Sequence, residues 1–512
     1  MNLVGKVGRN RPRARFALLM IYCALILGAV TTVYPFLMMV TTGFKSAYDE
    51  NDNSLVPKYW SDKDDLFLKY VDDKYARNVS MAKSNRIGAK ASSDVVAKYE
   101  TFLMNLPPDR YMAGFFLAAN QLSSRLTESY ISWLKTKYPT VAELNKAYEE
   151  ENLYWADIRP PIEQYMRKAW TEPNTRKFRE WKEFKTTLPA EYRIPIRNTA
   201  LWQEFQRAEA KAQFALVAPE VAGTAKTFEE LTLPKDPKLL TKFNEKALPP
   251  RYAKQSVEEM WAAVAGPGVE MPIDAFERAT LTKREADVKS EFASRNYRYA
   301  LGFILTNGRA LVNTAIYCLL AITVALIVNP LAAYALSRYP IRSSGRILLF
   351  LLATMAFPAE VAMIPSFLLL KSAGLLNTYW ALVLPGAASG YTIYLLKGFF
   401  DSLPQELFEA GSLDGAKEST MMLRIALPMS KPVLGYIALI TFMAAYGAFI
   451  YAFLVVQDQR MWTLTVWLYQ LQLTAPKAVV MAGLTLAAVP TLLVFLFAQR
   501  VIVRGIVIPN ER

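Results

Sequence analysis

The chain alternates between long apolar runs and one long, densely charged middle segment. Runs of about 20 mostly apolar residues, the length that a helix needs to cross a bilayer, lie near 16–40, 312–336, 347–370, 378–398, 433–456 and 479–501. The pattern predicts six transmembrane helices, so the fold class is an all-α polytopic membrane protein. It also predicts three parts: residues 1–45 with the first helix, an insert at 46–309, and residues 310–512 with helices two to six.

The first apolar run has two interpretations, a cleaved signal peptide or a retained membrane helix. Its apolar stretch is long, and Tyr34-Pro35-Phe36 stands where a cleavage site would need small residues. We therefore expect a retained helix.

Charge is distributed unevenly between these parts. Residues 1–45 carry six Lys and Arg and no acidic residue, and residues 310–512 carry 13 basic against eight acidic residues. Of the totals of 59 and 45, this leaves 40 basic and 37 acidic residues in the insert, so the net charge of +14 comes mainly from the membrane-flanking parts. Positive charge beside membrane helices sets their orientation, which is a better explanation of this excess than nucleic-acid binding.

The short basic segments agree on one topology. The N-terminal cluster includes Lys6, Arg9, Arg11, Arg13 and Arg15, and basic residues recur at 338–346 and at 500–504. Because cytoplasmic loops carry the excess of Lys and Arg, we expect both termini and the segment near 399–432 in the cytoplasm, with residues 46–309 outside it.

Several kinds of chemistry are excluded by what the sequence lacks. It contains no histidine, which removes histidine-based zinc sites and Ser-His-Asp catalysis. No Gly-x-x-x-x-Gly-Lys-Ser/Thr motif occurs, so the chain has no phosphate-binding loop for ATP. Cys23 and Cys318 both lie in apolar runs, so the insert can have no internal disulfide. We expect no enzyme activity, no cofactor and no metal.

The insert is long enough to have a hydrophobic core of its own. Capping patterns of the Ser/Thr-x-x-Glu type predict helix starts at Thr140, Thr227, Ser256 and Thr282. Proline pairs such as Pro107-Pro108 and Pro249-Pro250 predict breaks between helical parts. The insert is therefore predicted to be rich in helices.

A polar, helix-prone segment lies between the fourth and fifth apolar runs. It reads Glu406-Leu-Phe-Glu409-Ala410-Gly411-Ser-Leu-Asp414-Gly415-Ala416, followed by Ile425-Ala-Leu427-Pro428. An ordinary amphipathic helix at the membrane surface would have a similar composition. The spacing is more specific: Glu-Ala-Gly, three residues, Gly, nine residues, then Ile-x-Leu-Pro.

This spacing resembles the EAA loop of importer permeases of the ABC transporter superfamily, with Gly411 in place of the second alanine. Other parts of the chain are similar to MalG-like permeases of the carbohydrate-uptake type, including Asn313-Thr314 and the segment from Tyr334 to Arg338. Near Tyr446-Gly-Ala-Phe449 the sequence departs from that group, which leaves the substrate open. The likeness covers residues 1–45 and 310–512, and such permeases do not usually carry an insert of this size.

The resemblance implies a function and a set of partners. It implies a subunit of an ATP-driven, binding-protein-dependent importer in the bacterial inner membrane, for a sugar or oligosaccharide. The implied partners are a second homologous permease, an ABC ATPase dimer, an extracytoplasmic solute-binding protein and the lipid bilayer, with no nucleic acid. The coupling role of the loop is carried over to Glu409, Ala410, Gly411, Asp414 and Gly415.

Glu360 is a candidate for the translocation pathway. It lies within the third apolar run between Pro358 and Pro365, where an ionised group is costly unless it faces a cavity or a partner. The competing interpretation is a structural carboxylate, bonded either to backbone amides that the prolines free or to the partner permease.

A different class of function is also possible: a membrane-anchored carbohydrate-processing or sensing protein that works through its insert. The complete loop spacing through Ile425 and Pro428 is unexpected for a mere anchor and favours the importer.

Overall fold

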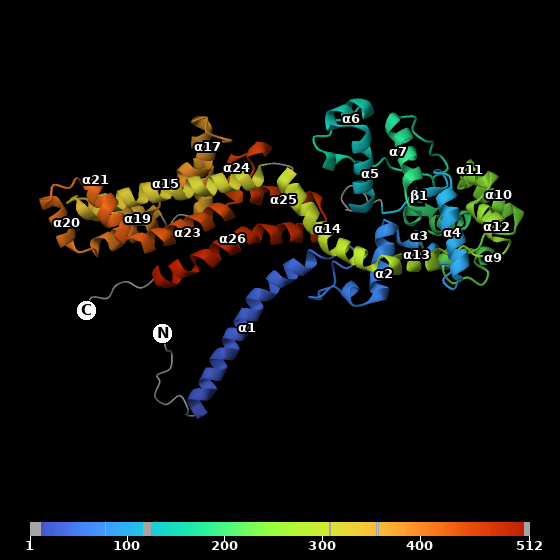
Figure 1. The fold of residues 1–512 in the computed structure, drawn as a ribbon, viewed down its shortest axis with the longest axis horizontal. Coiled ribbons are helices and arrows are strands. Elements are labelled where there is room, and N and C mark those ends of the chain that lie inside the picture. The colour runs from blue at the N-terminus through green and yellow to red at the C-terminus, as the bar shows by residue number, and fades with distance from the viewer. Residues whose placement is uncertain are drawn as a thin grey trace. The chain divides into compact units, whose positions relative to one another are not determined.

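The computed structural model describes residues 12–76, 78–115, 124–306, 309–354, 356 and 358–505. The basic residues Lys6, Arg9 and Arg11 lie outside this range. Most of the described chain is helical (Figure 1). Its contacts divide the chain into two units, residues 1–296 with 475–478, and residues 297–474 with 479–512.

Unit 1 contains the first apolar helix and the charged middle segment. Its helices are α1 (Pro12–Thr42), α2 (Lys63–Lys74), α3 (Val79–Ser84), α4 (Ser93–Asn105), α5 (Ser124–Lys137), α6 (Val141–Tyr148), α7 (Arg176–Thr187), α8 (Asn198–Glu209), α9 (Pro219–Ala222), α10 (Pro237–Lys246), α11 (Pro250–Lys254), α12 (Val257–Ala265), α13 (Ile273–Lys283) and α14 (Glu285–Thr306), whose last turns belong to unit 2. Strands β1 (Tyr111–Ala113) and β2 (Arg193–Pro195) form an antiparallel pair in which Met112 lies opposite Ile194.

The four capping patterns had different outcomes. Thr140 accepts a hydrogen bond from the Glu143 amide at 3.3 Å and begins α6, and Ser256 begins α12 with a reciprocal bond to Glu259. Thr227 precedes only a short 3-10 turn at Phe228–Glu230. The prediction at Thr282 was wrong: this residue lies inside α13, where its hydroxyl donates to the Arg278 carbonyl at 2.8 Å.

The core of unit 1 combines aromatic side chains with buried charges. Trp181, Trp202 and Trp261 are each 1% exposed. Two buried ammonium groups in this core have a carboxylate beside them: Lys185 and Glu163 are 2.7 Å apart, and Lys74 and Glu277 are 2.9 Å apart. Because an unpaired buried charge is strongly destabilising, these pairs are what permits so charged a sequence to bury its helices.

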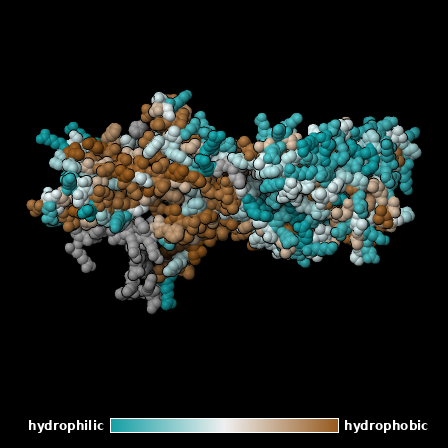
Figure 2. Space-filling view, turned by 45° about the horizontal axis from the view of Figure 1, so that its top comes forward, coloured by the Kyte–Doolittle hydropathy of each residue, from teal (hydrophilic) through white to brown (hydrophobic). Residues whose placement is uncertain are grey.

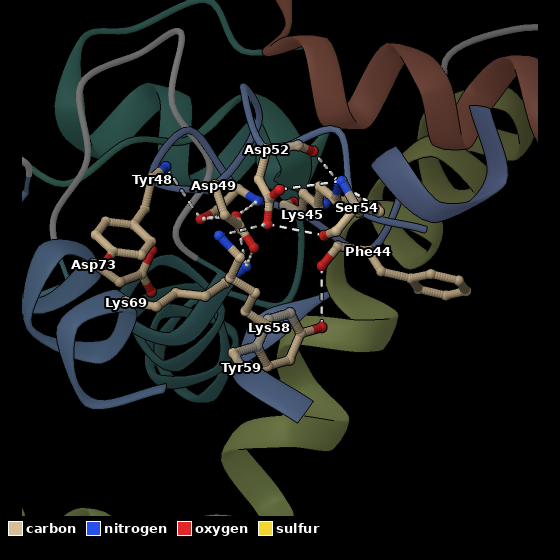
Figure 3. A network of polar contacts seen from close by, with 12 residues as sticks. Phe44, Lys45, Tyr48, Asp49, Asp52, Ser54, Lys58, Tyr59, Lys69 and Asp73 are labelled. Carbon is tan, nitrogen blue, oxygen red and sulfur yellow. Dashed lines mark hydrogen bonds and ion pairs between the residues drawn. The ribbon is translucent and has the colours of Figure 1, made fainter. Parts of the chain in front are cut away.

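A buried polar network surrounds the end of α1 (Figure 3). The Lys45 ammonium donates to the backbone carbonyls of Asp52 and, at 2.9 Å, of Ser54. Lys69 on α2 contacts both carboxylate oxygens of Asp49, at 2.7 and 2.8 Å, and its side chain is only 1% exposed. The chain that leaves α1 is therefore held against the helices of the insert.

Helix α14 contributes to the same junction. The Asn296 amide donates to the backbone carbonyls of Gly43 at 2.9 Å and Lys45 at 2.6 Å, and the Tyr59 hydroxyl donates to the Phe44 carbonyl at 3.1 Å. The carbonyls of Gly43 and Lys45, which follow α1, thus bind α14, although Asn296 lies 253 residues from Gly43 in sequence.

Unit 2 is built from apolar helices. They are α15 (Ala310–Arg338), α16 (Ser344–Thr354), α17 (Ala359–Ser372), α18 (Tyr379–Val383), α19 (Gly390–Asp401), α20 (Gln405–Leu413), α21 (Glu418–Met421), α22 (Leu427–Met429), α23 (Lys431–Gly447), α24 (Ile450–Val455), α25 (Leu464–Thr474) and α26 (Lys477–Gly505). Figure 2 shows hydrophobic residues gathered over the surface of the membrane part and hydrophilic residues over the insert. Large side chains such as Leu349, Leu369 and Phe497 are 70–82% exposed, which suits a lipid or protein environment.

Three of the described helices are long and apolar enough to cross a membrane: Leu18–Thr42, Ala310–Arg338 and Lys477–Gln499. The other three predicted spans are interrupted. The third consists of α16 and α17, the fourth of α18, a 3-10 turn at Leu384–Gly386 and α19, and the fifth of α23 and α24. The chain is thus a helical membrane protein, and the number of six spans stays a prediction.

Candidate functional site

The EAA-like segment forms a short helix at the end of unit 2. Pro404 precedes α20, and Phe408, which is 8% exposed, turns into the core. Glu409 and Ala410 lie on the exposed side, where the side-chain amide of Gln405 donates to the Glu409 carboxylate at 2.9 Å. Helix α20 therefore buries Phe408 on one side and has polar residues on its exposed side, as the sequence pattern indicates.

Gly415 ends this helix in a left-handed conformation. Its φ is +73°, its amide bonds to the Ser412 carbonyl at 3.1 Å, and the Ala416 amide bonds to the Gly411 carbonyl at 2.9 Å. These two bonds, with Asp414 as the C-cap, make up a Schellman motif. None of the described residues lies within 4 Å of a Cβ built on Gly415, so its backbone conformation, rather than lack of space, requires glycine.

Gly411 has a different environment. A Cβ at this position would lie 3.6 Å from side-chain atoms of Ile425 and Met421, which is ordinary van der Waals contact. The alanine of the family pattern would therefore fit here, and the substitution by glycine removes a contact without opening the turn.

The segment rests on the ends of two longer helices. The Arg338 guanidinium at the end of α15 lies 3.7 Å from the Phe408 ring centroid and donates to the Phe400 carbonyl of α19 at 2.6 Å. The Tyr334 hydroxyl, one turn earlier on α15, donates to the Glu418 carboxylate of α21 at 3.0 Å. Helix α20 therefore contacts α15 through Arg338, which is itself bonded to α19.

After α21 the chain changes direction. It winds as a π-helix over Met422–Ala426, and α21 and α22 then meet α23 at an angle of 79°. The structure places the bend at Ser430, which is fully buried and whose hydroxyl donates to the Ala426 carbonyl at 2.7 Å. Pro428 lies within the last turn before it, where it is tolerated at the start of α22.

The outer surface of the segment is both apolar and acidic. Leu413 is 89% exposed and Leu407 is 42% exposed, while Glu406, Glu409 and Asp414 are exposed beside them. We call these five residues the coupling surface. Its exposed leucines suit an apolar groove and its carboxylates suit a basic rim.

Glu360 lies far from this surface in sequence. It is the second residue of α17 and is exposed, and none of the described residues bonds to its carboxylate. The structure does not bring it together with the residues of α20, and none of the described backbone amides bonds to its carboxylate, so the form of the structural interpretation that remains is a bond to a partner permease.

Two buried asparagines of α15 were not singled out as sites by the sequence, although their amides connect segments far apart in the chain. Asn313 donates to the carbonyls of Arg460 and Trp462 at 2.9 and 3.0 Å, and accepts from the Tyr379 hydroxyl at 2.8 Å. Asn329 similarly bonds to the interruption between α18 and α19. For Asn329, the signal in the sequence was a side-chain amide inside an apolar run.

Comparison with known proteins identifies relatives of the C-terminal part. Residues 321–508 match the family described as binding-protein-dependent transport system inner membrane component. The chain is 35% identical over 198 residues to the probable ABC transporter permease protein YurM of Bacillus subtilis, which covers 38% of this chain and 66% of YurM.

Two further relatives carry more specific names. The sn-glycerol-3-phosphate transport system permease protein UgpE of Pectobacterium atrosepticum is 34% identical over 207 residues, covering 39% of this chain and 73% of UgpE. The polygalacturonan/rhamnogalacturonan transport system permease protein YtcP of Bacillus subtilis is 28% identical over 242 residues, covering 44% of this chain and 84% of YtcP. Each of these three matches thus covers less than half of the chain.

Proposed function

Because the chain belongs to the family of inner-membrane permease components of binding-protein-dependent ABC transport systems, we propose that it is one permease subunit of an ATP-driven importer for a sugar or oligosaccharide. Permease subunits of this family are not enzymes themselves. The sugar class is supported by the name of YtcP and by the likeness to MalG-like permeases.

The coupling surface is the observation that carries this proposal. Helix α20 carries Glu409, Ala410 and Gly411. Asp414 and Gly415 follow at its end, at the spacing of the EAA loop. The helix is small, but it is anchored through Phe408 to Arg338. A short amphipathic helix on a firm base can dock in the groove of another protein and transmit force.

The complete importer would contain four kinds of component. The chain would pair with a second homologous permease in the inner membrane, and an ABC ATPase dimer would bind the coupling surface from the cytoplasm. A solute-binding protein would deliver the solute to the other side, where we place residues 46–309. Six spans with both termini in the cytoplasm agree with this arrangement.

The test is purification of the tagged chain from its native membrane in mild detergent, with identification of the co-purifying chains and an ATPase assay. We expect a second permease and an ATPase to be recovered. Leu413→Asp places a charge at the most exposed leucine of the coupling surface and should remove the ATPase while retaining the permease.

The matched control is Leu153→Asp, the same substitution at a 76% exposed leucine of the insert. It should leave the recovered chains unchanged. Recovery of this chain alone from wild-type membranes would refute the importer, and full retention of the ATPase by Leu413→Asp would refute the coupling surface.

Glu360 is proposed as a residue of the translocation pathway, since it is exposed in an interrupted span and has no partner among the described residues. Glu360→Gln should leave the recovered subunits unchanged and lower uptake by the assembled importer. Unchanged uptake would remove it from the pathway.

The alternative of a carbohydrate-processing or sensing protein is not favoured. It gives no reason for a loop at the spacing of the EAA segment, which continues through Ile425 and Pro428.

A further inference from the structure

The fourth predicted span contains an interruption that is exposed on one side. The helix α18 ends at Val383, a 3-10 turn covers Leu384–Gly386, and α19 begins at Gly390 after the extended residue Ser389. Leu384 is 45% exposed, and Pro385, Gly386 and Ala388 are exposed as well. None of the described residues accepts a hydrogen bond from the Ala388 amide.

The opposite side of this interruption is held by the side chain of Asn329. Its Nδ2 donates to the Ala387 carbonyl at 3.3 Å and to the Ala325 carbonyl of its own helix at 2.9 Å, and its Oδ1 accepts from the Ser389 amide at 2.8 Å. The residue is 1% exposed. A carboxamide supplies both a donor and an acceptor to a backbone that has lost its helical partners, so it takes the place of a peptide group.

Backbone contact closes a third side. A Cβ built on Gly390 would lie 2.4 Å from the Leu351 carbonyl oxygen of α16, so the two backbones are in direct contact there. Contacts from α15 and α16 therefore hold the interruption in place. Within the described part of the chain, its exposed residues lie at 384–388.

The depth of this turn follows from the length of α15. Asn329 lies nine residues before Arg338, the last residue of α15. At 1.5 Å per residue this separation corresponds to about 13 Å along the helix. A hydrocarbon core is about 30 Å thick, so a turn bonded to Asn329 lies near its middle. Non-helical backbone with unpaired polar groups does not face lipid at that depth, and is tolerated where it lines water or protein.

We propose that Asn329 is a positioning residue for transport: its carboxamide holds the interruption at 387–389 so that the turn at 384–388 faces the water-filled solute pathway. This rests on the proposed function, because a permease is what supplies water at that depth. The turn would form part of the wall, and its free backbone groups would be available to the hydroxyl groups of a passing solute.

The test uses single cysteines in the full chain in its native membrane, after replacement of Cys23 and Cys318. Ala388→Cys reports on the turn. Ile327→Cys is the matched control, since Ile327 is 53% exposed, lies two residues from Asn329 on an uninterrupted helix, and points to the opposite side of α15. The probe is a charged, water-soluble thiol reagent.

The thiol of the Ala388→Cys variant should react roughly a hundredfold faster than that of the Ile327→Cys variant, because hydrocarbon strongly disfavours the ionised thiol that the reagent needs. Equal rates would overturn the assignment of the turn to the pathway. If no ATPase co-purifies but the Ala388→Cys variant reacts, the water-lined turn stands and the importer fails, so the two failures are distinguishable.

The role of Asn329 is tested in the Ala388→Cys background. Asn329→Leu has a similar volume but removes every side-chain hydrogen bond from this position to the interruption, and should slow labelling by about tenfold. Asn329→Asp retains the acceptor for the Ser389 amide and should restore much of the rate. The control for general misfolding is Leu413→Cys without Ala388→Cys, labelled after the membrane is disrupted; its rate should not change with either substitution of Asn329. An unchanged or faster rate at position 388 in Asn329→Leu would overturn the positioning role.

Discussion

At the scale of single residues, the two glycines of the coupling segment make opposite demands on the chain. Gly415 has φ +73° and no neighbour among the described residues within 4 Å of an added Cβ, whereas Gly411 is helical and has neighbours at contact distance. The same substitution should therefore have opposite effects four residues apart.

Gly415→Ala should destabilise the segment by about 1–2 kcal/mol, because an L side chain is disfavoured in the left-handed region. Gly411→Ala should stabilise it by about 1 kcal/mol through helix propensity. Hydrogen exchange of peptides covering residues 405–416 would show faster exchange for the first variant and slower exchange for the second. Equal changes in both would mean that backbone conformation does not govern this turn.

Lys69 makes the stability of the insert depend on pH. Burial lowers the pKa of Lys69 to about 8, against a contribution from Asp49 that raises it. Between about pH 8 and 10.5 the unfolded chain keeps the proton that the folded chain has lost, so unfolding takes up a proton and the folded state gains stability as the pH rises.

The comparison should be made with the double variant Lys69→Met/Asp49→Asn, which removes both charges together. The unfolding free energy of the wild type, relative to this variant, should rise by about 3 kcal/mol across that pH range, and stay constant below about pH 7. Denaturant unfolding of the full chain followed by tryptophan fluorescence measures it. A difference that does not vary with pH would show that Lys69 titrates normally.

At the scale of elements, the packing of α16 on α19 depends on the absence of a side chain at one position. Gly390 lies at the start of α19 against the Leu351 carbonyl, while Gly398, later on the same helix, has nothing within 4 Å of its would-be Cβ. The small-residue stretch at 386–390 thus serves backbone contact through one of its glycines.

Gly390→Ala should lower the thermal stability of the detergent-solubilised chain, since a 2.4 Å contact with backbone forces the two helices apart; overpacking of this kind costs about 1–3 kcal/mol. Gly398→Ala is the matched control and should raise stability slightly. If Gly390→Ala melted at the same temperature as Gly398→Ala, the close approach of α16 and α19 would be wrong.

At the scale of the whole molecule, the topology can be tested with two exposed leucines. Leu153 lies in the insert and Leu413 on the coupling surface, and they are 76% and 89% exposed. In a cysteine-free background, Leu153→Cys should react with an impermeant maleimide applied to cells with a permeable outer membrane. Leu413→Cys should react only after the inner membrane is disrupted. The reverse pattern would invert the chain, and labelling of both would contradict the separation of the two surfaces by a membrane.

The sequence was a good guide wherever a property depends on neighbours along the chain. Apolar runs indicated the membrane part, and the chain falls into the predicted family. The capping patterns at Thr140 and Ser256 began helices as expected. These features depend on local periodicity, propensity and conformational freedom, which a single sequence contains.

The tertiary structure decided what depends on distant neighbours. A run of about 20 apolar residues looks the same whether or not its helix is interrupted, so neither the end of α16 at Thr354 nor the break at 384–389 could be placed from hydropathy. The break at 384–389 is held by Asn329, which lies 60 residues from Ser389 in sequence, and by the backbone of Gly390 against Leu351. The same holds for the junction at Asn296, whose carbonyl partners follow α1. Hydrophobic burial selects which segments leave water, whereas specific hydrogen bonds and close contacts choose how those segments meet, and the partners in those contacts are known only once the chain has folded.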